Sequence, residues 1–521
     1  MKRECLRLLA DARSGDHRAQ RVVAEHYLRG TAGFPKHMRL GVEYLSHPEI
    51  SCTREASVVI ARSLSLTELL EMDCMRHLQT AAACSDATSL LKLAAWQCVI
   101  DARGTSVWPL LQRACEVCAP QADVAMRAWS TGEAAGRSIR LLTALSDVGL
   151  AGGTSTVLLQ AARLALESRD IRQAAHALQC LSSIEPMPDL AAARMLCRAL
   201  GLLREIETDG THLPSVRYVQ SALELASAEG DLEAAFILGR ALCWLDTGAI
   251  SAESVAVELN LRRGTALLLR AADGGCTDAW IDLYRLHSRN RSSVANPGVA
   301  TFCLEKAAAH GDTRAQRRMG VDALRQATSV RGFEQGIAWL HRASVQGDTR
   351  ADELLATLVF PVAGADEAAE DGLRLLQRRH PSLAVRLRVA RCFGLTRSEA
   401  LTFCPIAGNR PWGLVVDRNP FVTQSHLSLP RAVPAITAQA RQSLNEAISF
   451  FSAKAGDEGP AYEGLLRQRS LELRRTLRRL CVDDALYFAR ASSSAALAMK
   501  FGSKWVHRHR ELVAATTSWE A

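Results

Sequence analysis

The sequence predicts an all-α fold in which helix–turn–helix repeats stack on one another and a loop-rich, mostly helical C-terminal module follows them. Three observations predict it. A Gly-x-x-x-Ala stretch recurs along the chain, alanine, leucine and arginine dominate while aromatic residues make up only 5%, and 521 residues are too many for one ordinary core. Small helix-forming residues favour helices packed through short side chains over sheets.

The recurring stretch sets the repeat length. The letters GDTRA occur at 311–315 and again at 347–351, 36 residues apart. The aligned copies place glycine and alanine at Gly15 and Ala19, Gly230 and Ala234, Gly275 and Ala279, Gly311 and Ala315, and Gly347 and Ala351. From Ala234 to Ala279 the spacing is 45, and the excess lies in 246–259. That segment is predicted to be an insertion between two helices of one repeat.

Each unit is predicted to hold two helices. Small or apolar residues at offsets 0, 4, 5 and 8 from the alanine predict an amphipathic first helix. A bulky residue followed by a small pair, as in 300–311, predicts a second helix that ends at the next glycine. That glycine adopts the left-handed conformation, and Asp312 or Asp348 caps the next helix with its carboxylate. Helix pairs of this kind bury their faces by stacking into a solenoid.

This pattern resembles the Sel-one-like repeat (SLR), a relative of the tetratricopeptide repeat. Its units carry A-x-x-x-L-G-x-x-Y-x-x-G and later A-x-x-W-x-x-x-A-A-x-x-G. The matching residues are Ala19, Ala24, Tyr27, Gly30, Ala234, Leu238, Gly239, Ala271, Ala272, Gly275, Ala279, Ala307, Ala308, Gly311, Ala315, Gly320, Trp339 and Gly347. The resemblance implies a helical-repeat surface that binds a protein or peptide.

Three segments are expected. Residues 1–215 form an N-terminal helical region with one clear repeat followed by degenerate ones, interrupted by loops at 184–190 and 208–214. Residues 216–383 hold the regular repeats. Residues 384–521 begin with a proline-containing loop region, in which only 412–416 (WGLVV) is typical of a strand, and end with basic helices.

The candidate chemical motifs favour structural interpretations. Cys115 and Cys118 have Cys-x-x-Cys spacing, but no second pair follows, and Cys118 falls in the slot of a repeat-ending glycine, so packing is expected. Asp483 and Asp484 are expected to pair with Arg478 and Arg479. Neither a phosphate-binding loop nor a nucleophile elbow is present. The expectation is therefore a non-enzymatic protein without metal or cofactor.

Composition also suggests a location. The sequence shows no secretory leader and no run of about 20 apolar residues that would span a membrane. Fifteen cysteines, an odd number in a long chain, fit a reducing compartment better than a disulfide scaffold. A strong bias to arginine over lysine is typical of GC-rich bacterial genes. We expect a cytoplasmic, bacterial protein.

Two groups of arginines are candidate partner-binding residues. In the first helix of each unit, the positions opposite the packed face hold arginines, and these are expected to lie on one side of successive units. They are Arg240, Arg285, Arg289, Arg317, Arg318 and Arg325. Such a basic row would attract an acidic peptide. The alternative is that these are ordinary solvated arginines, interrupted by Asp282.

The second group lies near the C-terminus. Residues 384–521 carry 20 Lys/Arg and 11 Asp/Glu, so their net charge of +9 accounts for the whole chain's +8. In a helix over 465–480, leucines are expected to be buried while Arg474, Arg475, Arg478 and Arg479 flank or oppose them. An acidic protein surface is the favoured partner. Nucleic acid is less favoured because aromatic residues for base stacking are missing, and the alternative to any binding role is a merely solvated face.

The sequence therefore predicts a scaffold or adaptor that binds a protein or peptide through its repeats. The alternatives are a nucleic-acid-associated protein that uses the basic C-terminal module and an enzyme with an unrecognised C-terminal site. Salt-dependent retention on a nucleic-acid column would favour the former. Turnover that is lost with the C-terminal module would favour the latter.

Overall fold

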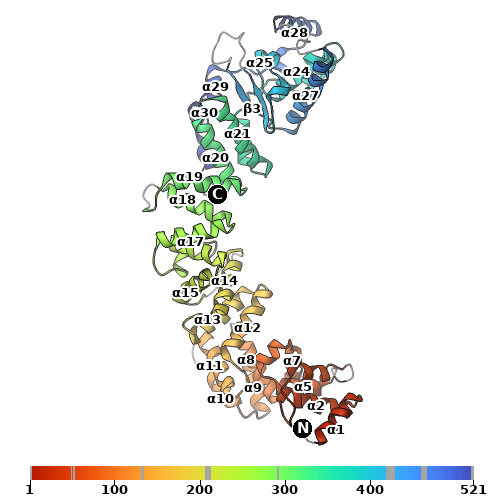
Figure 1. Cartoon of the computed structure of the whole chain (residues 1–521), viewed down its shortest axis with the longest axis vertical. Helices are drawn as coiled ribbons and strands as arrows, with labels where there is room; N and C mark the ends of the chain where they lie inside the picture. Colours follow the sequence, from red (N-terminus) through yellow and green to blue (C-terminus); the bar gives the residue numbers. More distant parts are fainter. Residues whose placement is uncertain are drawn as a thin grey trace. The chain divides into compact units, whose positions relative to one another are not determined.

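The computed structural model describes residues 3–47, 50, 53–101, 103–130, 134–205, 213–289, 293–417, 429–458 and 466–517. They belong to two compact units, Met1–Asp282 and Leu283–Ala521 (Figure 1). Both units consist mainly of helices that follow one another in pairs, which confirms the predicted all-α helix–turn–helix repeat fold. The three sequence segments remain a prediction, because this division is coarser.

The described part of unit 1 consists of helices and the connections between them. Its α-helices are α1 (Arg3–Arg13), α2 (His17–Arg29), α3 (Met38–Leu45), α5 (Arg54–Ser63), α6 (Leu66–Glu71), α7 (Met75–Ala83), α8 (Ala87–Ile100), α9 (Val107–Glu116), α10 (Ala122–Trp129), α11 (Ala134–Asp147), α12 (Thr154–Glu167), α13 (Ile171–Ile184), α14 (Leu190–Glu205), α15 (Val216–Ala228), α16 (Leu232–Leu242) and α17 (Leu261–Asp273). The loop predicted at 184–190 joins α13 to α14 as expected, whereas the one at 208–214 lies largely outside the described residues. The insertion at 246–259 joins α16 to α17 and holds a short 3-10 turn, Ala252–Ser254.

The junction between repeats has the predicted conformation. Gly15, Gly230 and Gly275 have φ angles of 100°, 101° and 102°, and Gly30, at the end of α2, has a φ angle of 68°. Asp16 and Asp231 accept hydrogen bonds from the first turns of α2 and α16. These aspartates satisfy backbone N–H groups that the helix itself leaves without a partner.

The same junction persists where the sequence pattern fades. Ser85, Cys118 and Arg169 have φ angles of 60°, 54° and 57°, so they adopt the left-handed conformation without being glycine. Asp86 and Asp170 then cap α8 and α13. The N-terminal region therefore keeps the repeat geometry at a conformational cost of about 1 kcal/mol per junction.

Unit 2 contains the last regular repeats and the C-terminal module. α18 (Thr277–Ser288) spans the boundary between the units. The other helices are α19 (Pro297–Ala309), α20 (Thr313–Gln326), α21 (Val330–Val345), α22 (Thr349–Ala356), α23 (Asp366–Gln377), α24 (Pro381–Cys392), α25 (Arg397–Thr402), α26 (Pro405–Gly408), α27 (Ala438–Glu458), α28 (Leu466–Leu480), α29 (Ser493–Ala498), α30 (Gly502–Arg508) and α31 (Arg510–Thr517). Gly311 and Gly347 have φ angles of 93° and 92°, and Asp312 and Asp348 cap α20 and α22, as predicted.

The two helices of a repeat cross at glycine. A Cβ atom added to Gly320 of α20 would lie 3.0 Å from the carbonyl oxygen of Gly336 in α21, and the reverse distance is also 3.0 Å. Gly239 of α16 and Gly264 of α17 approach each other in the same way, at 3.1 and 2.9 Å. The absence of side chains at these positions lets the helix backbones touch.

A small sheet lies in the proline-rich region of unit 2. Strands β1 (Asn409–Arg410), β2 (Gly413–Val416) and β3 (Arg431–Pro434) are antiparallel in the order β1-β2-β3, with Leu414 opposite Val433. The strand expected within 412–416 is confirmed. β3 was not expected, because it begins with Arg431 and ends with Pro434, and only two apolar residues lie between them.

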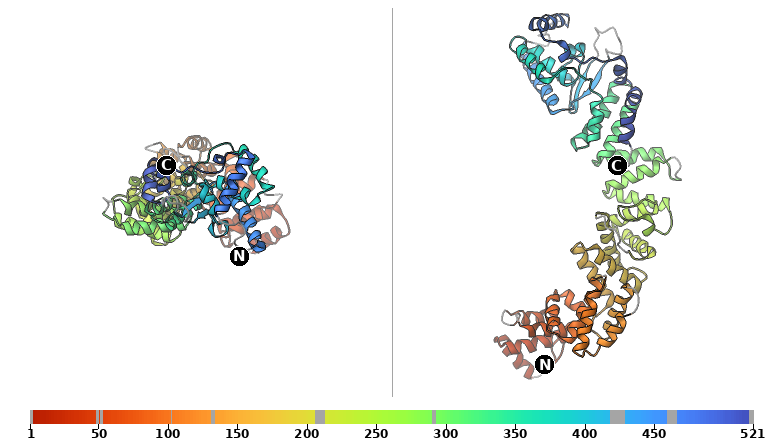
Figure 2. Two further views of the ribbon diagram at one scale, coloured as in Figure 1. Left: turned by 90° about the horizontal axis from the view of Figure 1, so that it is seen from above. Right: turned by 180° about the vertical axis from the view of Figure 1, so that it is seen from behind.

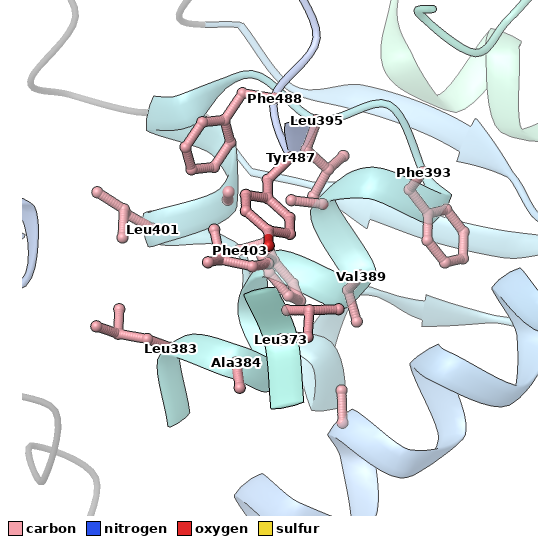
Figure 3. Close-up of a cluster of buried hydrophobic side chains, with 14 of the residues drawn as sticks. Leu373, Leu383, Ala384, Val389, Phe393, Leu395, Leu401, Phe403, Tyr487 and Phe488 are labelled. Atoms are coloured by element: carbon pink, nitrogen blue, oxygen red, sulfur yellow. The ribbon is translucent and has the colours of Figure 1, made fainter. Parts of the chain in front are cut away.

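Two hydrophobic clusters hold the C-terminal module. In the first, shown in Figure 3, Tyr487 and Phe403 pack among residues of α23 to α25, and the Tyr487 hydroxyl donates a 2.9 Å hydrogen bond to the carbonyl oxygen of Ala369. In the second, Trp505 of α30 is fully buried among residues of α20 to α22, and its Nε1 donates to Thr357 Oγ1 at 2.9 Å. Figures 1 and 2 show the last helices, α29 to α31 (blue), beside the helices of the last repeats (green). α24 also runs straight through the boundary predicted at 383/384.

Replacing Gly347 by alanine tests the junction. No atom lies within 4 Å of a Cβ added there, so the cost is conformational rather than steric. We expect the substitution to lower the free energy of unfolding by about 1 kcal/mol in urea denaturation. Gly298→Ala is the control, because Gly298 has an ordinary φ and only the Asn296 Oδ1 atom nearby, so the variant should be as stable as the wild type or slightly more so. Equal effects of both substitutions would contradict this explanation.

Lys92 predicts a pH dependence in unit 1. Its side chain is buried in α8, and Nζ donates to the carbonyl oxygens of Ala61 and Leu64, both at 2.6 Å. Burial lowers the pKa of Lys92 to about 8, although the carboxylates of Asp86 and Glu68 act in the opposite direction. Because the unfolded chain binds this proton more tightly, Lys92 destabilises the fold below pH 8, and this cost disappears as the pH rises toward 10.5.

The measurement is the unfolding free energy of the wild type and of Lys92→Met between pH 7 and pH 10. The difference between the two proteins should shift in favour of the wild type by on the order of 3 kcal/mol across that range. The two carbonyl groups that lose their donor in the variant add an offset that does not depend on pH. A constant difference would show that Lys92 has an ordinary pKa.

Candidate protein-binding site

A groove of about 670 Å³ opens beside the helices of two successive repeats in unit 2, a volume typical of ligand-binding clefts. Residues from α18, α19, α20, the α20–α21 connection and α21 line it. They are Tyr284, Ser288, Pro297, Ala300, Thr301, Leu304, Glu305, Met319, Asp322, Ala323, Gln326, Ala327, Thr328, Ser329, Arg331, Gly332 and Gln335. We call this set the groove.

The repeat pattern explains why the groove lies here. Five residues after the repeat alanine, other first helices carry Ala24, Gly239 or Gly320, the small residues of the helix crossing. In α18 that position is Tyr284, which lines the groove together with Ala300 and Leu304 of α19. Since a tyrosine ring does not permit the backbone contact that glycine permits, this repeat departs from the close crossing of its neighbours.

The groove offers both hydrogen-bonding groups and charge. Thr301, Thr328, Ser329, Gln326 and Gln335 are all exposed and supply hydroxyl and amide groups. Its charged residues are Glu305, Asp322 and Arg331. Polar groups of this kind, arranged around apolar positions, suit recognition of a polypeptide backbone and side chains.

The basic row predicted on the first helices is only partly available. Arg240 forms a 2.9 Å ion pair with Asp282 and lies over the ring of Phe236. Arg317 is 8% exposed and pairs with Asp348, the cap of the next first helix. These two arginines hold repeats together, so the expectation that they face a partner is corrected. A buried carboxylate beside each of them accounts for the change.

The other four arginines lie nearer the surface. Arg318 and Arg325 share the carboxylate of Asp322, at 3.0 and 3.7 Å, at the edge of the groove. Arg285 of α18 is half-buried, and Arg289, which directly follows α18, is exposed. Their partner-binding role remains a proposal.

The C-terminal arginines occupy the face of α28 that was expected. Leu473 and Leu477 are buried, whereas Arg474, Arg475, Arg478 and Arg479 are exposed.

The predicted ion pairs of Asp483 and Asp484 with Arg478 and Arg479 are wrong. Asp484 pairs with Arg397 at 3.4 Å, and Asp483 caps the following 3-10 turn through the N–H of Ala485.

The Cys-x-x-Cys motif is part of the repeat packing. The Sγ atom of Cys115 lies 3.0 Å from the Sδ atom of Met126, and Cys118 occupies the left-handed junction slot. Burial is the main cause that raises the pKa of the Cys115 thiol. In the part of the chain that the structure describes, no three histidine, cysteine or acidic side chains are grouped so as to hold a metal ion.

Two features were missed from the sequence. Tyr284 was detectable, since the alignment of the repeats places it where other repeats carry glycine or alanine.

The buried ion pair of Glu399 and Arg431 was not detectable from the sequence, because 32 residues separate its partners. Arg431 donates to both carboxylate oxygens of Glu399, at 3.1 and 2.9 Å, and lies 4.1 Å over the ring of Phe360. Despite burial, the charge of Arg431 lowers the pKa of Glu399.

Two solved helical-repeat structures are similar to this chain. One is a protective antigen present in uropathogenic Escherichia coli strains that displays an SLR fold, which is 14% identical, with 99% of this chain and 97% of that chain covered and a TM-score of 0.27. The other is a Sel1 repeat protein from Oxalobacter formigenes, which is 18% identical, with 69% and 91% covered and a TM-score of 0.26. No protein-family model and no curated protein matches the chain. Among the described helices, none combines the length and apolar character needed to cross a membrane.

The two classes of arginine predict different mutational effects. Arg317→Ala should lower the unfolding free energy by about 3 kcal/mol, because it leaves the carboxylate of Asp348 buried without its cation. Arg325→Ala removes a surface ion pair whose arginine is 44% exposed and should change it by less than about 0.5 kcal/mol. Chemical denaturation of the two variants measures both values. Comparable stabilities would mean that Arg317 is not a structural residue.

Proposed function

We propose that this chain is a non-enzymatic scaffold that binds a protein or peptide through its helical repeats. The observation that carries the proposal is the groove at the one aligned repeat whose helix crossing contains Tyr284 in place of a small residue. A bulky residue at this position prevents the close helix packing that glycine or alanine permits in the other repeats. A binding function explains why the position does not hold glycine.

The lining of the groove supports binding rather than catalysis. None of its residues is histidine, cysteine or lysine, and one of its two carboxylates, Asp322, is already engaged by Arg318 and Arg325. Histidine, cysteine and lysine are among the commonest general bases and nucleophiles, so their absence from this lining favours binding. The carboxylates of Glu305 and Asp322 also disfavour the phosphate backbone of a nucleic acid in this groove.

An extended peptide is the occupant that fits best. Exposed threonine, serine and glutamine side chains along the groove offer partners for backbone N–H and C=O groups, and Met319 and Leu304 offer apolar contact. We place this function in the cytoplasm of a bacterium, on the composition described above.

Site-specific photo-crosslinking in the host tests the proposal. A photoreactive amino acid is placed at Thr301 or Ser329, at the groove, and at the exposed Thr143 of α11 as a control. The groove positions should capture one and the same protein, identified by mass spectrometry, and the control should not. Capture of the same protein at all three positions, or of none, would contradict binding in the groove.

Three variants then separate the effect of the groove from that of general stability. Tyr284→Gly should reduce capture several-fold because it allows the helices to approach and the groove to narrow, whereas Tyr284→Phe keeps the ring and should leave capture unchanged. Thr301→Arg, at an exposed position, blocks the groove without touching the core. Circular dichroism of each variant shows whether the helices are intact. Undiminished capture by Tyr284→Gly and Thr301→Arg would exclude the groove.

A further inference from the structure

α28 presents arginines that the fold itself does not use. Arg475, Arg478 and Arg479 are exposed, and within the described ranges none of them has an ion pair or a side-chain hydrogen bond. Arg474 is exposed too and makes one long hydrogen bond, 3.4 Å, to Ser470. This contrasts with the arginines of the repeats, such as Arg240 and Arg317, which bind carboxylates.

A second element extends this charge. Glu472 of α28 reaches His380 at 2.9 Å, and His380 is the N-cap residue of α24, three residues after the end of α23. Arg378 and Arg379, just before His380, are exposed and have no ion pair among the described residues. Arg475 and Arg479 follow Glu472 by three and seven residues, which places them on the same side of α28. The turn after α23 and this side of α28 therefore adjoin.

We call this set, Arg378, Arg379, Arg474, Arg475, Arg478 and Arg479, the arginine surface. Glu472 is the carboxylate within it, and it is already engaged by His380. All six cations are arginine, whose planar guanidinium binds carboxylates in a bidentate manner and stays charged at any relevant pH. Six such groups close together repel one another unless an anionic partner neutralises them.

Apolar side chains within the arginine surface indicate the class of partner. Leu471 of α28 is 42% exposed and lies three and seven residues before Arg474 and Arg478, so it shares their side of the helix. Leu375 of α23 is 55% exposed and precedes Arg378 and Arg379 by one turn. Phosphate backbones offer nothing to exposed leucines, whereas acidic protein segments that also carry apolar residues do.

We propose that the arginine surface binds an acidic, amphipathic protein segment, with carboxylates on the arginines and apolar residues on Leu471 and Leu375. The proposal is independent of the groove, since none of these residues lines it. It assigns the chain a second contact surface and so a means of bringing two partners together.

The probe is a labelled synthetic helix-forming peptide of glutamates with leucines every three to four residues, titrated with the full chain in fluorescence anisotropy. Three comparison probes are the same peptide with serine for leucine, the same peptide with lysine for glutamate, and a DNA duplex. The first peptide should bind tightest, its affinity should fall between about 50 and 300 mM salt, and the lysine peptide should not bind.

Variants locate the contact. Replacement of Arg474, Arg475, Arg478 and Arg479 together by glutamate should weaken peptide binding at least tenfold. The control replaces by glutamate four exposed arginines of α1 and α2, which are Arg3, Arg7, Arg13 and Arg18. It has the same net charge as the arginine-surface variant, but it should bind the peptide like the wild type. Leu471→Ser should weaken binding of the leucine peptide but not of the serine peptide. Tyr284→Gly should have no effect, which separates this surface from the groove.

Three results would overturn the proposal. They are absence of peptide binding by the wild type, equal losses in the arginine-surface variant and its charge-matched control, and binding of the DNA duplex that is as tight as that of the leucine peptide and indifferent to Leu471→Ser.

Discussion

The close crossing of two helices within a repeat, at glycine or alanine, is the contact on which the rest of the structure depends. At Gly320 and Gly336, and again at Gly239 and Gly264, the backbones approach so closely that an added Cβ would lie about 3 Å from a carbonyl oxygen of the other helix. Gly41 of α3 meets Ala24 of α2 in the same way, at 3.1 Å. This spacing lets leucines such as Leu340 and Leu268 reach across and bury themselves fully, so hydrophobic burial follows from the crossing.

The repeat junctions extend the same arrangement along the chain. At Gly230, Gly311 and Gly347 a left-handed residue ends the second helix, and the aspartate that follows caps the next first helix, which reverses the chain in two residues. Arg317 then binds the capping Asp348, so this cap belongs to the contact between repeats as well as to its own helix. At the end of the array, Trp505 and its helix cover the apolar face of α20 and α22 that no further repeat buries.

Sequence reasoning succeeded where a local rule fixes the structure. A glycine followed by an aspartate predicts a left-handed turn and a cap from two residues, and both were found. It succeeded only in outline between α7 and α13, because Ser85 and Arg169 adopt the junction conformation without the glycine that would signal it. Tertiary contacts outweigh the local preference there.

The candidate sites were harder to predict for the same reason. Helical offsets placed Arg317 on a surface, but the carboxylate that buries it comes from the next repeat, 31 residues away. The exposed arginines of α28 were predicted correctly, because amphipathic spacing alone decides which side of a helix is buried. Their neighbours Arg378 and Arg379 were missed, since only the fold brings α23 to α28.

Sequence position alone also could not show that Tyr284 borders an open groove, because that depends on how neighbouring helices accommodate its ring. The central claim is that this departure from close packing is a binding site. Hydrogen–deuterium exchange of the full chain, with and without the partner identified by crosslinking, tests it most directly. Protection should concentrate in Pro297–Glu305 and Met319–Gln335, the segments that line the groove. Protection elsewhere, with these segments unchanged, would contradict the claim.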